Sequence, residues 1–600
     1  FRLLTGGART VLPRQQTLRA VVDWSWDLLD ESERAVLRRL SVFAGGCDLA
    51  AAEAVCTDGD GDGDGRPVDI ADALGALVDK SLVIAAPTPD GMRYHLLETI
   101  HEYAAERAAA HATDRLATAA RHAAHFLALA EEAEPLLRSA AQLPWIRRME
   151  TELDNLRAAL LHTTETAATE TAETAATEPA ATEAAQRLAL ALGWFWWLRD
   201  YRREGARWSA RIAALTPTEP PEGTPAYWRL MRLQLLRLNL DADGRPPEEF
   251  TTPWHVALAD RLREVFRRGG PEAARFPAML WPMTGFLTGA TPDFRAGLDA
   301  TVANCRRHGG DWELGVTLML RTHVAIDTTG GLSTVDADLA ELHEIAGRVG
   351  DRWIRSQVAS AAGEVALSRS RYDWARTEYE ECLRLAREVG AHTESPFAIA
   401  RIAETAFCQG DYAEAERLLA DAHREAEQHG TGHEIRAYGG LLAALIAMAH
   451  GDLAQARDRY DLARAAVPDA PVPPQLTAGL DNVDALLTAR EQGPAAGLAR
   501  IGPALAAAVA ARCAERVLAS MADTAAVLLE AAGRPAASVR VLAAATAWRA
   551  GHPRSVPEQT AVSELPARTR AALGLEHHAR EAAAGELLSP PEVAALLTGS

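Results

Sequence analysis

Apolar positions recur with the period of an α-helix along most of this chain. From about residue 186 onward, stretches of roughly 15 residues with apolar side chains three and four positions apart alternate with breaks of glycine, proline or Gly-Asp. Alanine is abundant, whereas β-branched and aromatic residues are few, and this balance favours helix over sheet. The pattern therefore predicts an all-α protein built from successive helices of similar length.

A helix–turn–helix motif recurs in the middle of the chain. Asp373, Asp411 and Asp452 mark equivalent positions, 38 and 41 residues apart. In each copy, a small residue in the first helix would let the second helix approach closely, and an alanine shortly after the turn would sit at the next contact. This spacing is typical of the tetratricopeptide repeat (TPR), a unit of about 34 residues that stacks into an α-solenoid. The residues assigned to the repeat signature are Gly363, Tyr372, Ala375, Ala403, Gly410, Tyr412, Ala415, Ala444, Gly451, Ala456 and Pro468.

The N-terminal part follows a different pattern. Residues 1–27 form a polar connector, after which Asp30 begins the first of three predicted helices, with the next two near residues 48–55 and 69–80. Two short strands, 82–85 and 92–96, predict a β-hairpin, and a helix over 98–110 follows. Three helices, a hairpin and a helix are the order of a small winged-helix domain, which we assign to residues 28–112.

The other boundaries follow from changes in composition and from a second repeated pattern. Gly310-Asp311-Trp312 recurs 40 residues later as Gly350-Asp351-Arg352-Trp353, so we expect repeats well before residue 350. The predicted segments are a pair of linker helices over 113–162, a low-complexity linker over 163–185, degenerate TPR-like repeats over 186–350, clear TPR repeats over 351–470, and C-terminal TPR-like helices with a cap over 471–600.

The charge of the chain bears on its partners. The formal net charge is −20, and an acidic surface repels phosphate backbones. The third predicted helix of the winged-helix domain contains Asp69, Asp72, Asp79 and Lys80, the only lysine of the chain. We therefore expect no direct contact with nucleic acid from this chain, and a packing role for that helix.

No catalytic or metal-binding pattern emerges. A phosphate-binding P-loop needs a lysine after a glycine, but Asp79 precedes Lys80. His122 and His125 form an H-x-x-H pair without a third ligand, which we interpret as surface or partner-facing histidines. The Asp-Gly alternation over 58–65 fits an exposed loop better than a calcium site. We expect no enzymatic activity, no metal and no cofactor bound by this chain alone.

Cysteine usage and hydropathy indicate a cytoplasmic protein. The six cysteines are scattered and form no C-x-x-C, so free, mostly buried thiols in a reducing compartment are expected. No apolar stretch of about 18 residues is present, and no signal peptide is visible, so no membrane contact is expected. The chain enters patterned sequence directly at Phe1, from which we infer a fragment of a longer polypeptide.

Several segments of the chain resemble one family. They are residues 1–7, 12–20 and 24–29 (FRLLTGG, LPRQQTLRA and WSWDLL), 40–46 (LSVFAGG), 93–104 (RYHLLETIHEYA), 152–160 (ELDNLRAAL), 192–199 (LGWFWWLR) and the closing residues 572–590. The chain is similar in these segments to the part that follows the nucleotide-binding core in bacterial STAND ATPases, relatives of NB-ARC proteins. The likeness is to actinobacterial transcriptional regulators of the AfsR/SARP and LuxR-like kinds.

This resemblance implies a division of labour. In such regulators a DNA-binding domain and an ATPase switch are joined to a winged helix and a TPR sensor, so ATP or ADP would be bound by a domain upstream of this chain. NB-ARC relatives carry a Met-His-Asp motif whose histidine contacts the ADP β-phosphate. The aligned residues here are Leu96, Leu97 and Glu98, and the neighbouring His95 and His101 are the nucleotide-proximal candidates.

The leading hypothesis is therefore the regulatory and sensing part of a transcriptional regulator. The TPR groove would bind a protein, a peptide or a small effector, the winged helix would hold the chain's own ATPase domain, and activation would permit oligomerisation. The rival hypothesis is a TPR scaffold that bridges protein partners without switching. An enzyme would require a polar pocket that the sequence does not reveal.

Overall fold

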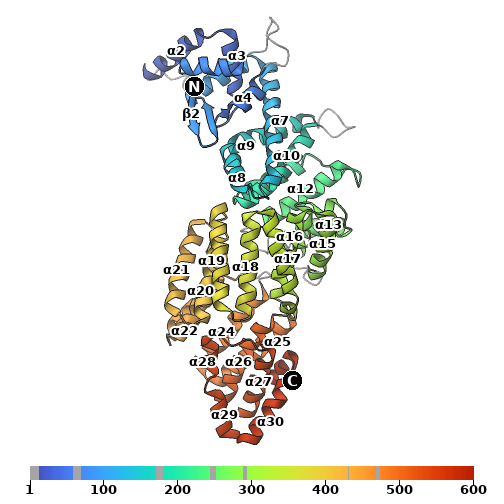
Figure 1. Ribbon diagram of the computed structural model, residues 1–600, viewed down its shortest axis with the longest axis vertical. Coiled ribbons are helices and arrows are strands. Elements are labelled where there is room, and N and C mark those ends of the chain that lie inside the picture. Colours follow the sequence, from blue (N-terminus) through green and yellow to red (C-terminus); the bar gives the residue numbers. More distant parts are fainter. Residues whose placement is uncertain are drawn as a thin grey trace. The chain divides into compact units, whose positions relative to one another are not determined.

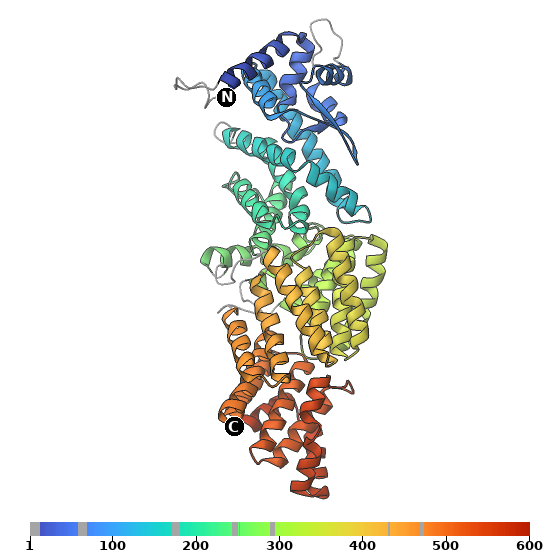
Figure 2. The ribbon, with the colours of Figure 1, turned by 90° about the vertical axis from the view of Figure 1, so that its left-hand side faces the viewer.

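Helices make up nearly all of the chain that the structure describes (Figures 1 and 2). The computed structural model describes residues 13–57, 69–170, 180–242, 250, 252–287, 294–429, 432–467 and 473–599. The all-α prediction is confirmed, with one small sheet near the N-terminus. The predicted acidic loop over 58–65, part of the predicted linker over 163–185, and Pro468 lie outside the described residues.

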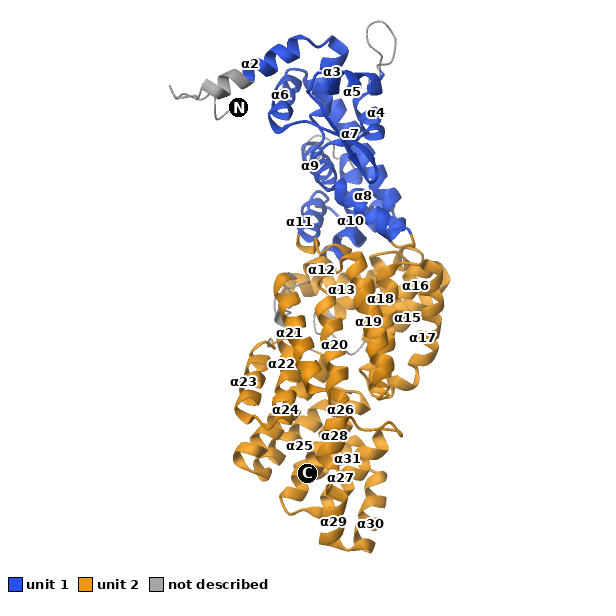
Figure 3. Ribbon diagram, turned by 60° about the vertical axis from the view of Figure 1, so that its left-hand side comes forward, with its two compact units in different colours: residues 1–137, 141–197, 204–237 blue, residues 138–140, 198–203, 238–600 orange. Residues whose placement is uncertain are grey.

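The chain divides into two compact units (Figure 3). The first contains residues 1–137, 141–197 and 204–237, and the second contains residues 138–140, 198–203 and 238–600.

The first unit begins with the winged-helix fold that the sequence predicts. A three-stranded antiparallel sheet has the order β1-β3-β2, and the hairpin pairs Ile84 with His95 and Thr88 with Gly91. The elements are α2 (Pro13–Asp27), α3 (Glu31–Leu40), β1 (Cys47–Asp48), α4 (Leu49–Cys56), α5 (Ile70–Asp79), β2 (Ile84–Thr88), β3 (Gly91–His95) and α6 (Glu98–Ala109).

Aspartates at the helix starts explain why these helices were predictable. Asp30 accepts a hydrogen bond from the backbone N–H of Glu33, and Glu33 closes the capping box. Asp48 and Asp69 cap α4 and α5 in the same way. Two elements escaped prediction: α2, within the segment predicted as a polar connector, and β1, whose two residues are too short to show alternation.

Six further helices complete the first unit. They are α7 (Ala112–Leu136), α8 (Gln142–Thr151), α9 (Leu153–Glu170), α10 (Ala180–Leu198), α11 (Arg202–Ala213) and α12 (Pro225–Asp241). Where two linker helices were predicted over residues 113–162, the structure has three. The sequence hides the break because Trp145, Met149, Leu153 and Leu156 keep helical spacing across Glu152, the residue between α8 and α9.

The second unit is a solenoid of antiparallel helix pairs. Its helices are α13 (Pro253–Arg267), α14 (Met283–Leu287), α15 (Phe294–His308), α16 (Asp311–Ile326), α17 (Val335–Val349), α18 (Arg352–Ser368), α19 (Tyr372–Val389), α20 (Ser395–Cys408), α21 (Tyr412–His429), α22 (Gly432–Ala449), α23 (Leu453–Ala465), α24 (Pro474–Gln492), α25 (Pro494–Ala510), α26 (Glu515–Ala531), α27 (Pro535–Trp548), α28 (Val556–Val562), α29 (Leu565–Leu573), α30 (Leu575–Glu586) and α31 (Pro590–Thr598). Short 3₁₀ turns lie at Glu272–Ala274, Ala278–Leu280 and Gly331–Ser333.

The predicted repeat residues lie at the contacts within the pairs α18/α19, α20/α21 and α22/α23. Gly410 and Gly451 take positive φ values of 85° and 80° at the turns between the paired helices. The small residues Ala403 and Ala444 of the first helices, and Ala375, Ala415 and Ala456 of the second, are each 0% exposed. Tyr372 and Tyr412 begin the second helices of the first two pairs.

The second repeated pattern lies at a different kind of junction. Gly310 and Asp351 are the N-caps of α16 and α18, so these anchors precede the first helix of a pair and do not lie in the turn within it. The indole N–H of Trp312 donates to the carboxylate of Asp351 at 2.8 Å, which joins one junction to the next. The pattern therefore does mark helix pairs before residue 350.

The cysteine prediction is confirmed, and hydropathy adds one finding. All six cysteines are buried and unpaired. Burial raises the pKa of the Cys56, Cys305 and Cys382 thiols to about 12, so these thiols stay protonated. Within the described ranges, no helix is both long and apolar enough to cross a membrane.

We expect Gly363→Ala to destabilise the second unit. A Cβ at Gly363 would lie 2.7 Å from the ring of Tyr379, which is 0% exposed and cannot give way freely. Overpacking costs about 1–3 kcal/mol, against a helix-propensity gain of about 0.5–1 kcal/mol. Gly347→Ala, where a Cβ meets nothing within 4 Å, is the matched control. Urea unfolding followed by circular dichroism should show a lower midpoint for Gly363→Ala alone; equal midpoints would contradict the close contact.

Candidate functional site

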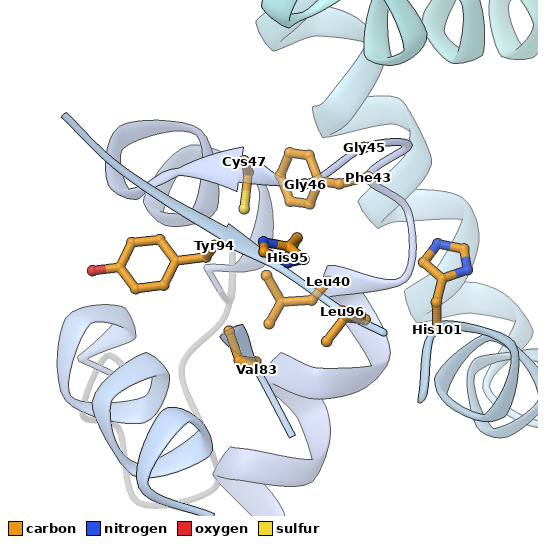
Figure 4. Close-up of a pocket in the computed structure, with 10 residues that line it drawn as sticks. All are labelled: Leu40, Phe43, Gly45, Gly46, Cys47, Val83, Tyr94, His95, Leu96 and His101. Atoms are coloured by element: carbon orange, nitrogen blue, oxygen red, sulfur yellow. The ribbon is translucent and has the colours of Figure 1, made fainter. Parts of the chain in front are cut away.

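A small cavity lies in the first unit beside the winged-helix sheet (Figure 4). Its volume is about 190 Å³, below the range of about 300–1,000 Å³ that is usual for sites enclosing a whole small ligand. The cavity can therefore hold one chemical group of a ligand. The lining residues are Leu40, Phe43, Gly45, Gly46, Cys47, Val83, Tyr94, His95, Leu96 and His101.

His95 and His101, the nucleotide-proximal candidates, both line this cavity. His95 ends β3, His101 lies in the first turns of α6, and Leu96 follows His95 along the chain between them. Figure 4 shows His95 beside the glycine loop and His101 on the α6 side of the cavity. Leu97, the position aligned with the motif histidine, is the N-cap of α6 and is 52% exposed.

The loop at Gly45 and Gly46 requires glycine. Both residues have positive φ values, 86° and 87°. A Cβ at Gly46 would lie 2.4 Å from the backbone oxygen of Tyr94 and 2.9 Å from the Cβ of His95. The absence of a side chain at Gly46 thus lets the loop lie directly against the end of β3.

Two side chains bind this loop directly, and a third side chain binds both of them. The guanidinium of Arg93 donates to the Gly45 oxygen at 3.1 Å and to the Gly46 oxygen at 3.0 Å. Asn155 of α9 donates to the same Gly46 oxygen at 2.9 Å and accepts from the Ala44 N–H at 2.9 Å. We call Arg93, Glu152 and Asn155 the loop clamp, because Glu152 in turn binds Arg93 at 2.8 Å and Asn155 at 2.7 Å.

The loop clamp is buried and electrically balanced. Glu152 is 1% exposed and Asn155 is 0% exposed. Burial opposes the charge on Arg93, but the hydrogen bonds and negative charge of Glu152 outweigh it and raise the pKa of that guanidinium. The sequence places residues 152–160 within the predicted linker helices and within a segment that resembles the family, but it did not predict their function as a clamp, although Glu152 and Asn155 have the spacing of neighbours on a helix face.

A family comparison identifies the domain that contains the cavity. Residues 29–109 match the sequence model of a family described as a winged helix-turn-helix domain. This segment is a winged helix-turn-helix domain. The clamp residues Glu152 and Asn155 lie outside the matched residues, so the domain's glycine loop is held from beyond the domain itself.

The chain is also homologous to mycobacterial proteins. Proteins of Mycobacterium bovis and Mycobacterium tuberculosis that are provisionally named HTH-type transcriptional regulators are each 31% identical over 403 residues, which cover 66% of this chain and 41% of theirs. The chain thus spans about two fifths of the length of these relatives.

Two solved structures share helical architecture with the chain at low similarity. One is a STAND protein with a tetratricopeptide repeat sensor from Pyrococcus horikoshii. The aligned region spans 76% of this chain and 65% of that protein, with 11% identity and a TM-score of 0.37. The other is a Rap protein complexed with Competence and Sporulation Factor. The aligned region spans 67% of this chain and 99% of that protein, with 13% identity and a TM-score of 0.42. Likenesses of this size say nothing about function.

The winged helix-turn-helix match is at odds with the expectation that this chain makes no contact with nucleic acid, because such domains as a class bind DNA. That expectation rested on the net charge of −20 and on the acidic third helix, α5. The helix does carry Asp72 and Asp79, with Asp69 as its N-cap, and Lys80 is ion-paired with Glu33. The charges of one helix do not exclude contacts by other parts of the domain.

The prediction that His122 is a surface residue is wrong. Its imidazole is 1% exposed and lies between Phe43 and Phe126, with ring centroids 5.3 and 4.6 Å away. Its Nε2 lies 3.3 Å from the Asn155 oxygen, so it also supports the loop clamp. His125 is half-buried. Within the described part of the chain, no group of three or more His, Cys, Asp or Glu residues could hold a metal ion.

We expect Asn155→Ala to destabilise the first unit by about 1–3 kcal/mol, because the Ala44 N–H would lose its side-chain acceptor, whereas the Gly46 oxygen would still accept from Arg93. Asp154→Ala is the control: this neighbouring side chain is 65% exposed and pairs within its own helix. Thermal unfolding and amide exchange of residues 43–47 measure the effect. A loop with wild-type protection in Asn155→Ala would rule out the clamp.

We also expect acid to weaken the first unit through His122. Burial lowers the pKa of this histidine to about 4, from about 6.5 in the unfolded chain. The unfolded state therefore binds the proton more tightly. The contribution of neutral His122 to the free energy of unfolding is complete above pH 6.5 and falls by roughly 3 kcal/mol as the pH drops to 4. His122→Gln, which keeps a donor toward Asn155, should flatten the pH dependence. An unchanged slope would assign the acid sensitivity to other groups.

Proposed function

We propose that this chain is the regulatory and sensing part of a STAND-type transcriptional regulator. In this proposal the winged helix-turn-helix domain docks on a nucleotide-binding domain of the same polypeptide. The TPR solenoid binds an effector or a protein partner, and effector binding releases the docked state through its different affinity for the two states. Oligomerisation would follow release.

The observation that carries the proposal is the cavity with His95 and His101. Its volume of about 190 Å³ suits one group, such as a phosphate, of a larger ligand held mainly by another domain. A glycine loop clamped against β3 and two imidazoles among the lining side chains would suit that role. ATP or ADP would then be the ligand shared across the docked domains.

The sequence supports placing the nucleotide-binding machinery elsewhere in the polypeptide. No G-x-x-x-x-G-K-[ST] is present, because the only lysine follows Asp79. The mycobacterial relatives are longer than this chain, which spans 41% of their length. Six unpaired, buried cysteines suit a reducing, cytoplasmic setting.

The family match favours a second candidate, direct DNA contact by the winged helix-turn-helix domain. Titration of a fluorescein-labelled duplex distinguishes the two. Binding that weakens steeply with salt would favour DNA contact, because phosphate contacts release counterions. A duplex that stays unbound at low salt would favour docking.

Calorimetry of the chain with ATP·Mg²⁺ and with ADP·Mg²⁺ tests the proposed division of labour. We expect no saturable heat from the isolated chain, since the cavity encloses only one group of the nucleotide. Tight binding of either nucleotide to the chain alone would overturn the proposal.

The upstream reading frame separates the switch from a TPR scaffold. A P-loop ahead of Phe1 in the same frame supports the switch. A start codon there, with no nucleotide-binding domain, supports a scaffold that bridges protein partners.

A further inference from the structure

The first helices of successive pairs in the second unit form a row that closes on itself. Neighbouring members of the row α16, α18, α20, α22, α24 and α26 are joined by packing or by hydrogen bonds between their side chains. At the ends of the row, the Thr329 N–H donates to the Arg512 oxygen at 3.0 Å and the Thr329 hydroxyl donates to the Cys513 oxygen at 2.7 Å. The Gly330 N–H donates to the Glu515 carboxylate at 2.7 Å. The segment after α16 is thus tied to the segment before α26.

These helices bring charged side chains together. Arg401 of α20 donates to Glu364 of α18 at 2.9 Å and to Glu404 of its own helix at 3.0 Å. Tyr438 of α22 donates to Glu404, and Arg516 of α26 lies 3.7 Å from the same carboxylate. With Asp327, at the end of α16, these residues form what we call the polar cluster: Asp327, Glu364, Arg401, Glu404, Tyr438 and Arg516.

Water reaches the polar cluster although protein surrounds it. The side chains of Arg401 and Arg516 are 31% and 39% exposed, yet burial is the largest influence on the pKa of each. Asp327 is exposed as well, and burial is the first cause of its raised pKa, followed by the charge of Glu364. Because these side chains are partly exposed and also surrounded by protein, a solute can replace the water that reaches them.

The polar cluster has an excess of negative charge and unused acceptors. Three carboxylates face two guanidiniums, and no described Lys, Arg or His nitrogen lies within 4.0 Å of Asp327. Asp327 also lies at the C-terminal end of α16, where the backbone carbonyls favour a cation. The chain thus holds a carboxylate without an ion pair at a point where positive charge would be stabilised.

Two buried polar atoms beside the polar cluster lack partners. The side-chain oxygen of Gln475 has no hydrogen-bond partner, while a hydrogen bond from this residue lowers the pKa of Asp327. The Tyr379 hydroxyl, on a side chain that is 0% exposed, also has none, and the charges of Arg401, Glu364 and Glu404 act on it. A buried polar atom without a partner costs free energy, so a bound group that reaches these atoms would be stabilised.

We propose that the polar cluster binds the primary ammonium group of a ligand, with Asp327 as its counter-ion and the Gln475 oxygen as a second acceptor. An ammonium group has three donors on one compact charge, which matches a carboxylate flanked by free acceptors. The proposal rests on the sensor role proposed for the solenoid, and it names the chemistry of the effector. The ammonium group would belong either to a free amine or to a lysine side chain of a peptide.

A purely structural ion network makes the opposite prediction about stability. The raised pKa of Asp327 means that the folded chain disfavours its charged form. At a pH above the pKa that Asp327 has in the folded chain, its ionisation therefore lowers the stability of the fold. Asp327→Asn should accordingly unfold at the same or a higher temperature than the wild type. A residue that closed the helix row by ion pairing would instead lower that temperature when replaced.

Calorimetry of the whole chain near pH 7.5 tests the proposal with three probes: pentane-1,5-diamine, the peptide acetyl-Ala-Lys-Ala-amide, and the same peptide with an acetylated lysine. We expect saturable binding of at least one amine probe and none of the acetylated peptide. Asp327→Asn should lower the affinity for the amine probe at least about tenfold, which is about 1.4 kcal/mol. Asp421 is a carboxylate of α21 that pairs within its own helix, so Asp421→Asn should change this affinity by less than about twofold.

The outcomes distinguish the two sources of the ammonium group, and they distinguish a failure of the site from a failure of the sensor role. Binding of the diamine alone indicates a small amine, and binding of the peptide alone indicates a peptide effector. Failure of both probes, equal binding to Asp327→Asn and wild type, or a lower unfolding temperature with unchanged binding would overturn the proposal. If Asp327→Asn does not fold, Gln475→Leu takes its place and should lower the affinity for the amine probe at least about threefold. If the amine binds but the full-length regulator does not respond to it, the site stands and the sensor role fails.

Discussion

The first unit depends on the carbonyl oxygen of Gly46, which accepts hydrogen bonds from both Arg93 and Asn155. Arg93 belongs to β3 of the winged helix-turn-helix domain, whereas Asn155 belongs to α9, beyond it. The two donors meet on one oxygen because Glu152 binds both of them in a buried setting. The orientation of the glycine loop, the position of His95 and one wall of the cavity all follow from this contact.

The second unit is built on the opposite principle. Its helix pairs approach closely because Gly363, Ala403 and Ala444 present almost no side chain to their partners. Against that apolar packing, the polar cluster is costly: it encloses more negative charge than it neutralises and leaves buried acceptors unused. Arrangements that reduce stability without adding packing are commonly kept for binding, which is why the polar cluster and not the repeat contacts carries the proposed effector chemistry.

Local signals made much of the fold predictable. Helix caps at Asp30, Asp48 and Asp69, the wing hairpin and the repeat spacing each depend on residues close together in sequence. The candidate site was half predictable, since His95 and His101 were found through a motif position. The loop clamp, the burial of His122 and the polar cluster join residues that are dozens to hundreds of positions apart, which no local pattern records.

Amide hydrogen exchange on the full-length polypeptide tests the central claim most directly. The account predicts that residues 40–47 and 93–101, which include the glycine loop, His95 and His101, exchange slowly with ADP bound and faster with ATP and effector, because docking covers the cavity in one state only. Equal exchange of these residues in both nucleotide states would contradict a winged helix-turn-helix domain that holds the switch.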